Sequence, residues 1–394
     1  LDDHVVLIHG DLSTLERVRS VLGSRALEKT QWRRLQFVVI IPGIFHGVMA
    51  CTDGIWRTYL KDKRSHMDPS STLHHAGIFR PQDTGKMKKN PPFRMVHDLI
   101  KHDSVAHRLD IWRAEVSCRL PESNTLEKWA ETKPNWDNIV TMSECMVMRY
   151  VAQPGFKRHP DTICRDIVFE NSQLRQRDYL LYEETTYAMN HGDIGRLETC
   201  FVTWIYIWKA TGKNKYATYL GDFIKDVHFV YPERLRRAIR LNWLCNLRGL
   251  PDTFRAIDWV VELNNLYTKH IHGGEFSNRT LDYLLKESGL IDIYQRSQVN
   301  ISDNFCMTNC TINHAKPNMV ETYKKVCNHM TANQTHEHVA GRTELYEVKD
   351  KLREGFGMIQ KRKHTSRRIR KASPCLTCPN PSSPPNLCLI HLTV

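Results

Sequence analysis

The chain has 394 residues, of which 41% are hydrophobic, and it contains nine tryptophans and twelve cysteines. This composition excludes a disordered chain and favours two or three folded domains with reduced, mostly buried thiols. No apolar run approaches the ~20 residues of a membrane span. Asp2, Asp3 and His4 interrupt any N-terminal signal peptide. We therefore expect a protein of the nucleus or cytoplasm that is not secreted, has no membrane partner and shows no evident small-molecule substrate.

Positive charge is concentrated near the C-terminus. The net charge is +13, and residues 355–394 hold seven Lys/Arg and no Asp/Glu, so the other residues carry +6. Such a run is typical of a nuclear-import or polyanion-binding arm, although it also fits a solvated extension without a partner. Contacts with DNA phosphates would be salt-sensitive and independent of base sequence. The candidate nucleic-acid-binding residues are Lys361, Arg362, Lys363, Arg367, Arg368, Arg370 and Lys371.

Residues 1–62 have the pattern of a partial α/β core. We expect a strand over His4–Ile8, a helix over Leu12–Leu27 and a second buried strand over Gln36–Ile41. A helical pattern resumes from Gly43 to Leu60. The fold class predicted for the whole chain is an α/β N-terminal portion with a large, mainly α-helical remainder.

The rest of the chain divides by composition and by Gly and Pro positions. Residues 61–92 are basic, polar and rich in proline, which predicts a long loop. We expect a helical insertion over 63–173, a helical domain over 174–300, an uncertain and partly helical segment over 301–360, and a disordered basic tail rich in Cys and Pro over 361–394. Expected helices lie near 93–116, 137–151, 174–190, 194–211, 214–228, 232–247 and 253–268, with a helix pair in 278–300.

Two groups of segments together resemble a known family. The first is HGDLSTLERVRSVL followed by VVIIPGIFHGVMACTDGIWRTYL, and the second begins RDYLLYEETTYAMNHGDIGRLETCFVTWIYIWKATG. In order and spacing they resemble a large fungal family catalogued as domain of unknown function 6589, over roughly residues 1–300. Its members resemble transposon-derived proteins with an RNase H-like core and a helical insertion. The resemblance therefore implies a partial RNase H-like sheet.

The same resemblance implies a two-metal acid site, in which three carboxylates hold Mg²⁺ for phosphodiester cleavage. Asp11 would be the second acid and Glu184 the third. The first acid would belong to an earlier strand, which this sequence lacks. We therefore expect a degenerate transposase-derived protein that associates with nucleic acid and is catalytically inactive. The alternatives are a non-catalytic helical scaffold and an active Mg²⁺-dependent nuclease or transposase.

Several of these candidates also have ordinary structural interpretations. Asp11 fits the N-cap of the following helix, where Ser13 and Glu16 would form a capping box. Glu184 neighbours Glu183, so one of the two must face solvent. Asp193 most simply caps the next helix.

His46 fits a core histidine better than a metal ligand or acid–base residue. Trp204, Tyr206 and Trp208 resemble a base-stacking surface, but at helical spacing they more often form core.

Two cysteine and histidine patterns have zinc-ligand spacing. The first is Cys375-x2-Cys378, followed by Cys388-x2-His391 in a proline-rich tail that offers little to pack. The looser second pattern is Cys306-x3-Cys310-x3-His314, with Cys327 and His329 beyond it. A tail without function is the alternative for the first pattern, so zinc stays one of two interpretations.

Overall fold

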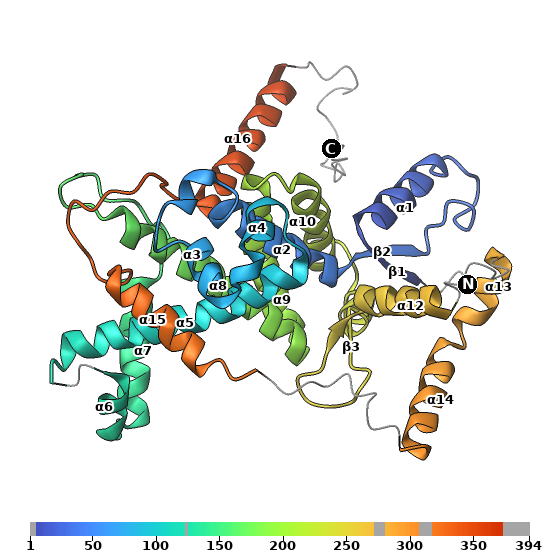
Figure 1. The fold of residues 1–394 in the computed structure, drawn as a ribbon. Coiled ribbons are helices and arrows are strands. Elements are labelled where there is room, and N and C mark those ends of the chain that lie inside the picture. Colours follow the sequence, from blue (N-terminus) through green and yellow to red (C-terminus); the bar gives the residue numbers. More distant parts are fainter. Residues whose placement is uncertain (1–4, 123–124, 272–279, 307–316, 373–394) are drawn as a thin grey trace.

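The computed structural model describes residues 5–122, 125–271, 280–306 and 317–372, and these are predominantly α-helical (Figure 1). A small parallel sheet lies near the N-terminus. In the described residues, no helix has both the length and the apolar character to cross a membrane.

A β-α-β unit opens the fold. β1 (Val6–Gly10) and β2 (Val38–Pro42) are parallel, and α1 (Leu12–Ser24) connects them. The two strands and the helix match the prediction within a few residues. Gly10 lies opposite Pro42 in the register, so both strands end at the same edge. Parallel strands need a crossover connection, and α1 between the two strands provides it.

α2 (Ile44–Tyr59) follows β2 directly and is mostly buried. It packs against α5 (Phe93–Arg119), α8 (Ile167–His191) and α9 (Ile194–Ala210), and this packing forms the main core. Trp204 and Trp208 on α9 are fully buried. The base-stacking interpretation of those two side chains is therefore wrong, and the core interpretation is confirmed.

The predicted loop over 61–92 is wrong, because that segment is mostly short helices. Ser71 caps α3 by accepting a hydrogen bond from the His74 N–H, and α3 buries Leu73 and Ala76. These helices are too short for a helical period of apolar residues to be recognised in the sequence. The segment and the helices after it comprise 3₁₀ turns at Lys63–His66 and Pro81–Asp83, α3 (Thr72–Phe79), α4 (Thr84–Lys89), α5 (Phe93–Arg119), α6 (Leu126–Glu131) and α7 (Trp136–Tyr150).

A short antiparallel pairing of two residues with two changes the predicted helices near 232–247 and 253–268. Leu244 and Cys245 pair antiparallel with Ala256 and Arg255, so the first helix ends at Leu241 and the second begins at Ile257. The elements of this region are α10 (Asn214–Phe229), α11 (Glu233–Leu241), β3 (Leu244–Cys245), β4 (Arg255–Ala256), α12 (Ile257–Ile271), α13 (Leu281–Ser288) and α14 (Ile291–Asn304).

Two further helices complete the described structure, α15 (Val320–Ala332) and α16 (Lys351–Ala372). α16 packs against α9 and projects from the body (Figure 1). A Cβ atom on Gly355 would lie 1.8 Å from the Tyr206 carbonyl oxygen, so the backbones are in contact. α16 continues to Ala372, past the predicted start of the disordered tail at 361. Residues 373–394 lie outside the described part, so the tail prediction stays a prediction.

Candidate functional site

Asp11 stands directly after β1 and caps α1. Its Oδ1 accepts a 2.8 Å hydrogen bond from the Thr14 N–H. Partial burial opposes ionisation, but the Thr14 hydrogen bonds and the nearby His46 and Arg17 charges lower the pKa of Asp11. The capping interpretation of Asp11 is confirmed. The predicted capping box is wrong, because Glu16 pairs with Lys215.

Asp258, in the first turn of α12, supplies the cap that α2 lacks. The N-cap of α2 is Gly43, which has no side chain. Asp258 accepts hydrogen bonds from the Phe45 N–H, the His46 N–H and the His46 Nδ1–H at 3.1, 3.1 and 2.9 Å. A Cβ atom on Gly43 would lie 2.2 Å from Asp258 Oδ2, so only glycine permits this approach. A buried carboxylate thus binds the positive end of α2.

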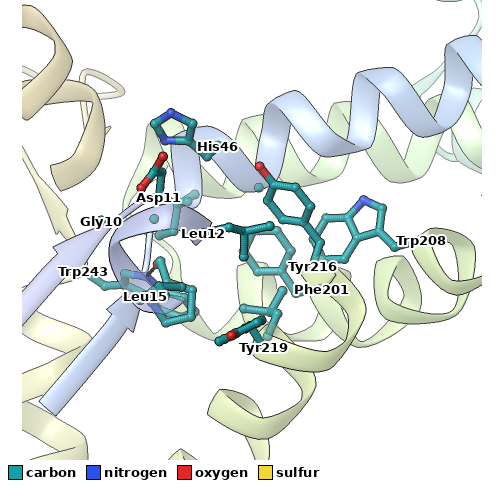
Figure 2. Close-up of a pocket in the computed structure, with 15 residues that line it drawn as sticks. Gly10, Asp11, Leu12, Leu15, His46, Phe201, Trp208, Tyr216, Tyr219 and Trp243 are labelled. Carbon is teal, nitrogen blue, oxygen red and sulfur yellow. Dashed lines mark hydrogen bonds between the residues drawn. The ribbon is translucent and has the colours of Figure 1, made fainter. Parts of the chain in front are cut away.

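His46 lies between several carboxylates. The hydrogen bond that His46 donates to Asp258 raises the pKa of His46 against the effect of partial burial, and the charges of Asp258, Asp11 and Glu262 act in the same direction. With Nδ1 bound to Asp258, the other ring nitrogen lies 3.7 Å from Glu262 Oε1. Figure 2 shows Asp11 and His46 at this edge of the sheet. We call Asp11, His46, Asp258 and Glu262 the strand-end cluster.

A narrow pocket of about 20 Å³ opens beside the strand-end cluster. Its floor is aromatic and includes Phe201, Trp208, Tyr216 and Trp243 (Figure 2). Burial raises the pKa of Tyr216 to about 12, so its hydroxyl stays neutral. This volume suits a single water molecule, not a nucleotide. Any phosphodiester would therefore have to approach the cluster from solvent.

Glu184 has partners separate from those of Asp11. It accepts two 2.6 Å hydrogen bonds from the Arg196 guanidinium at the surface. The neighbouring Glu183 is bound in the same way by Arg108. The structure therefore brings Glu262, and not Glu184, to His46 and the end of β1.

Sequence reasoning missed this site on α12. The available signal was the Asp258-x3-Glu262 spacing, which places both acids on one helix face. Asp193 is confirmed as a cap, since it accepts a hydrogen bond from the Arg196 N–H at 3.0 Å.

The ligand atoms of the strand-end cluster do not lie close enough together to form a metal site in the structure. Among the described residues, the side chains that lie close enough to share a metal ion are His75, Asp103 and His107. Neither Asp11 nor Glu184 belongs to such a group. Mg²⁺ binding by these two carboxylates stays a prediction.

The other predicted sites lie largely outside the described residues. The zinc candidates Cys375, Cys378, Cys388 and His391 all do, as do Cys310 and His314. Of the looser pattern, Cys327 contacts the Ala106 carbonyl and His329 bonds the Pro69 carbonyl at 2.7 Å. In the basic run, Lys361 continues α16. The structure does not describe the side chains of the other basic residues, which are Arg362, Lys363, Arg367, Arg368, Arg370 and Lys371. Zinc binding and nucleic-acid contacts by the tail therefore stay predictions.

A basic face that the sequence reasoning did not single out lies on α11. Arg234, Arg236 and Arg237 form no ion pair with any described residue, while Leu235 and Ile239 pack against the core. Trp243, two residues beyond α11, donates a 2.8 Å hydrogen bond to the Pro42 carbonyl at the end of β2. The arginine-bearing helix therefore ends beside the edge that carries the strand-end cluster.

These features define a mainly helical protein with one parallel β-α-β unit and an acidic cluster where its strands end. The chain belongs to the family described as "Family of unknown function (DUF6589)", which matches residues 1–314. No curated protein and no solved structure matches the chain.

Proposed function

We propose that this chain is a transposase-derived, nucleic-acid-associated protein whose strand-end carboxylates serve structure and not phosphodiester cleavage. The observation that carries the proposal is the Asp258 carboxylate, which already accepts three N–H donors from the start of α2. A magnesium ion would have to displace these donors. Asp11 is similarly engaged by Thr14 at the start of α1. Both acids therefore stabilise helix ends as the protein folds.

Nucleic-acid association is supported by the arginines of α11. Arg234, Arg236 and Arg237 project from a helix whose opposite face is packed on the core. Arginine without an ion-pair partner is well suited to phosphate, because its planar guanidinium donates two parallel hydrogen bonds. The basic run of residues 361–371 adds charge at the end of α16.

A nuclease assay tests the structural role of the acids. Supercoiled and linear DNA are incubated with the wild type and Asp11→Asn in Mg²⁺ and in Mn²⁺. We expect no metal-dependent cleavage by either protein. Cleavage by the wild type that is lost in Asp11→Asn would overturn the inactive assignment.

A salt-dependent DNA-binding measurement tests the nucleic-acid partner. Fluorescence anisotropy with a labelled duplex compares the wild type with the triple variant Arg234→Gln, Arg236→Gln, Arg237→Gln. Each lost phosphate contact reduces the slope of log K against log salt by about 0.9, so we expect a decrease of about 2–3. Arg196→Gln is the control, since Glu184 already neutralises that side chain. Absence of binding at low salt would instead favour the non-catalytic scaffold.

One observation favours metal-dependent cleavage as a second candidate function. A histidine that binds a carboxylate through one ring nitrogen and presents the other is a common metal ligand. His46 does this, with Asp258 on Nδ1 and Glu262 near Nε2. If cleavage is found, Glu262→Gln should abolish it and Glu184→Gln should leave it intact. The reverse pattern would restore Glu184 as the third acid.

A further inference from the structure

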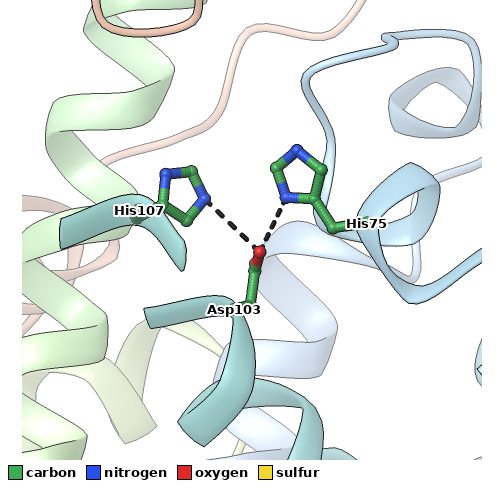
Figure 3. Close-up of side chains that lie close together, drawn as sticks. All are labelled: His75, Asp103 and His107. Carbon is green, nitrogen blue, oxygen red and sulfur yellow. Dashed lines mark hydrogen bonds and ion pairs between the residues drawn. The ribbon is translucent and has the colours of Figure 1, made fainter. Parts of the chain in front are cut away.

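A second polar cluster lies among α3 and α5 (Figure 3). His75 comes from α3, while Asp103 and His107 lie four residues apart on α5, and all three are fully buried. Asp103 Oδ1 lies 2.7 Å from His75 Nδ1 and 3.6 Å from His107 Nε2. One ligand atom from each residue fits within 4.8 Å of the other two.

Asp110 fixes the positions of the protons on the adjoining rings. Its Oδ2 lies 2.6 Å from His336 Nδ1, so that nitrogen carries a proton and donates it. In the tautomer that this bond selects, His336 Nε2 is an acceptor. The partner of that Nε2 is His107 Nδ1 at 2.9 Å, which must therefore be the donor.

His107 Nε2 is consequently left with a lone pair. The Asp103 carboxylate accepts hydrogen bonds from His75 Nδ1 and from the Tyr179 hydroxyl. Two electron-pair donors thus face each other at 3.6 Å, and His107 Nε2 has no hydrogen-bond partner.

This arrangement is costly without a cation between the two groups. A buried polar atom that lacks a hydrogen bond is unfavourable, and a buried charge more so. His75 Nε2 also lacks a partner. Because His75 faces Asp103 through Nδ1, an ion between the two groups would not change the state of Nε2. The distinguishing atom is therefore His107 Nε2.

We propose that His75, Asp103 and His107 bind a divalent first-row transition metal ion, with Zn²⁺ as the best fit. Two imidazoles and one carboxylate form a ligand set that such ions prefer. The outer contacts fit as well, because His336 holds His107 and the Tyr179 hydroxyl donates to Asp103 Oδ2 at 3.3 Å.

Such an ion would have a structural role. It would tie α3 to α5, and through His336 it would hold the segment that follows α15. His336 lies beyond residues 1–314, which match the family. The site therefore joins the family region to the chain that follows it.

Metal content is measured by elemental mass spectrometry on the full chain, purified without a histidine tag from cells grown with added zinc. To remove any thiolate site in the tail, the background carries Cys375→Ser, Cys378→Ser and Cys388→Ser. We expect about one metal ion per chain in this background. The ion should be lost in the double variant Asp103→Asn, His107→Gln and retained in His74→Gln, which alters the exposed neighbour of His75. Equal metal content in all three proteins would overturn the proposal.

A second measurement does not depend on folding of the double variant. The background protein is treated with chelator, and its thermal unfolding is followed as Zn²⁺ is added back. We expect the melting temperature to rise with Zn²⁺, and His336→Leu to require a 10–100-fold higher zinc concentration. A melting temperature that is insensitive to both chelator and Zn²⁺ would refute metal binding.

Cobalt distinguishes this site from a cysteine site. In the unaltered chain, Co²⁺ bound by His75, Asp103 and His107 should show no thiolate-to-cobalt charge-transfer band. If the only bound cobalt shows such a band, the ion lies on cysteines and the proposal fails.

Discussion

The Asp258 carboxylate accepts hydrogen bonds from both the backbone N–H and the ring Nδ1–H of His46, a residue 212 positions earlier in the chain. This contact fastens the start of α12 to the start of α2. Because the N-terminus of a helix carries partial positive charge, a buried anion there is stabilising. Gly43 makes the approach possible, since any side chain at that position would occupy the space of Asp258.

Asp258→Ala should lower the free energy of unfolding by about 1–3 kcal/mol, because it leaves the N–H groups of Phe45 and His46 without their acceptor. Urea denaturation monitored by tryptophan fluorescence measures the loss. Glu262→Ala, one turn later on α12, is the control and should have a much smaller effect because its side chain is half exposed. Equal losses in the two variants would contradict a capping role.

His46→Gln should cost more stability at acidic than at basic pH. The Asp258 hydrogen bond raises the pKa of His46 above 6.5 in the folded state. The stabilisation is then complete below about pH 6.5 and is lost as the pH rises through the folded-state pKa. Unfolding free energies at about pH 5.5 and about pH 9 should show a larger difference between wild type and variant at the lower pH. A difference that is independent of pH would exclude a charged His46.

His97→Gln should have the opposite pH dependence. Burial lowers the pKa of His97 to about 4, and its Nδ1 lies 2.6 Å from the Tyr182 hydroxyl. Between about pH 6.5 and about pH 4 the unfolded chain takes up a proton that the folded chain refuses, so stability falls as the pH falls. Between about pH 7.5 and about pH 5, urea midpoints should therefore fall less in the variant than in the wild type. A steeper fall in the variant would count against this pKa direction.

Gly355→Ala should displace α16 from α9, because its new methyl group would lie 1.8 Å from the Tyr206 carbonyl oxygen. We expect a loss of about 1–3 kcal/mol, as for an overpacked core. Gly357→Ala is a matched control on the same helix, since no atom lies within 4 Å of its added methyl group. Alanine there should be neutral or stabilise by up to about 1 kcal/mol. Limited proteolysis of α16 would report the displacement, and identical digestion of both variants would argue against it.

The features that the sequence predicted best are the helices, strands and caps that depend on residues close together in the chain. Its apolar pattern indicated β1, α1, β2 and α2, and Asp193 was expected to cap α9. The segment over 61–92 was misread because α3 and α4 are too short to show a helical period. The capping box failed because Asp11, two positions before Ser13, is the N-cap of α1 and accepts the hydrogen bond from the Thr14 N–H.

The candidate site could be predicted only in part, because its halves are far apart in the chain. Asp11 can be recognised from the sequence because it directly follows an apolar strand. No pattern in the neighbouring sequence indicates a functional role for Glu262. It reaches His46 only because α12 packs against α2 and β1. The family resemblance implied Glu184 as the third acid, whereas in the structure its carboxylate is bound by Arg196 on the next helix.

The close approach of Gly355 to the Tyr206 carbonyl oxygen anchors α16 on α9. α9 in turn carries the fully buried Trp204 and Trp208 of the main core. A change in the position of α16 would therefore act directly on a helix of the main core.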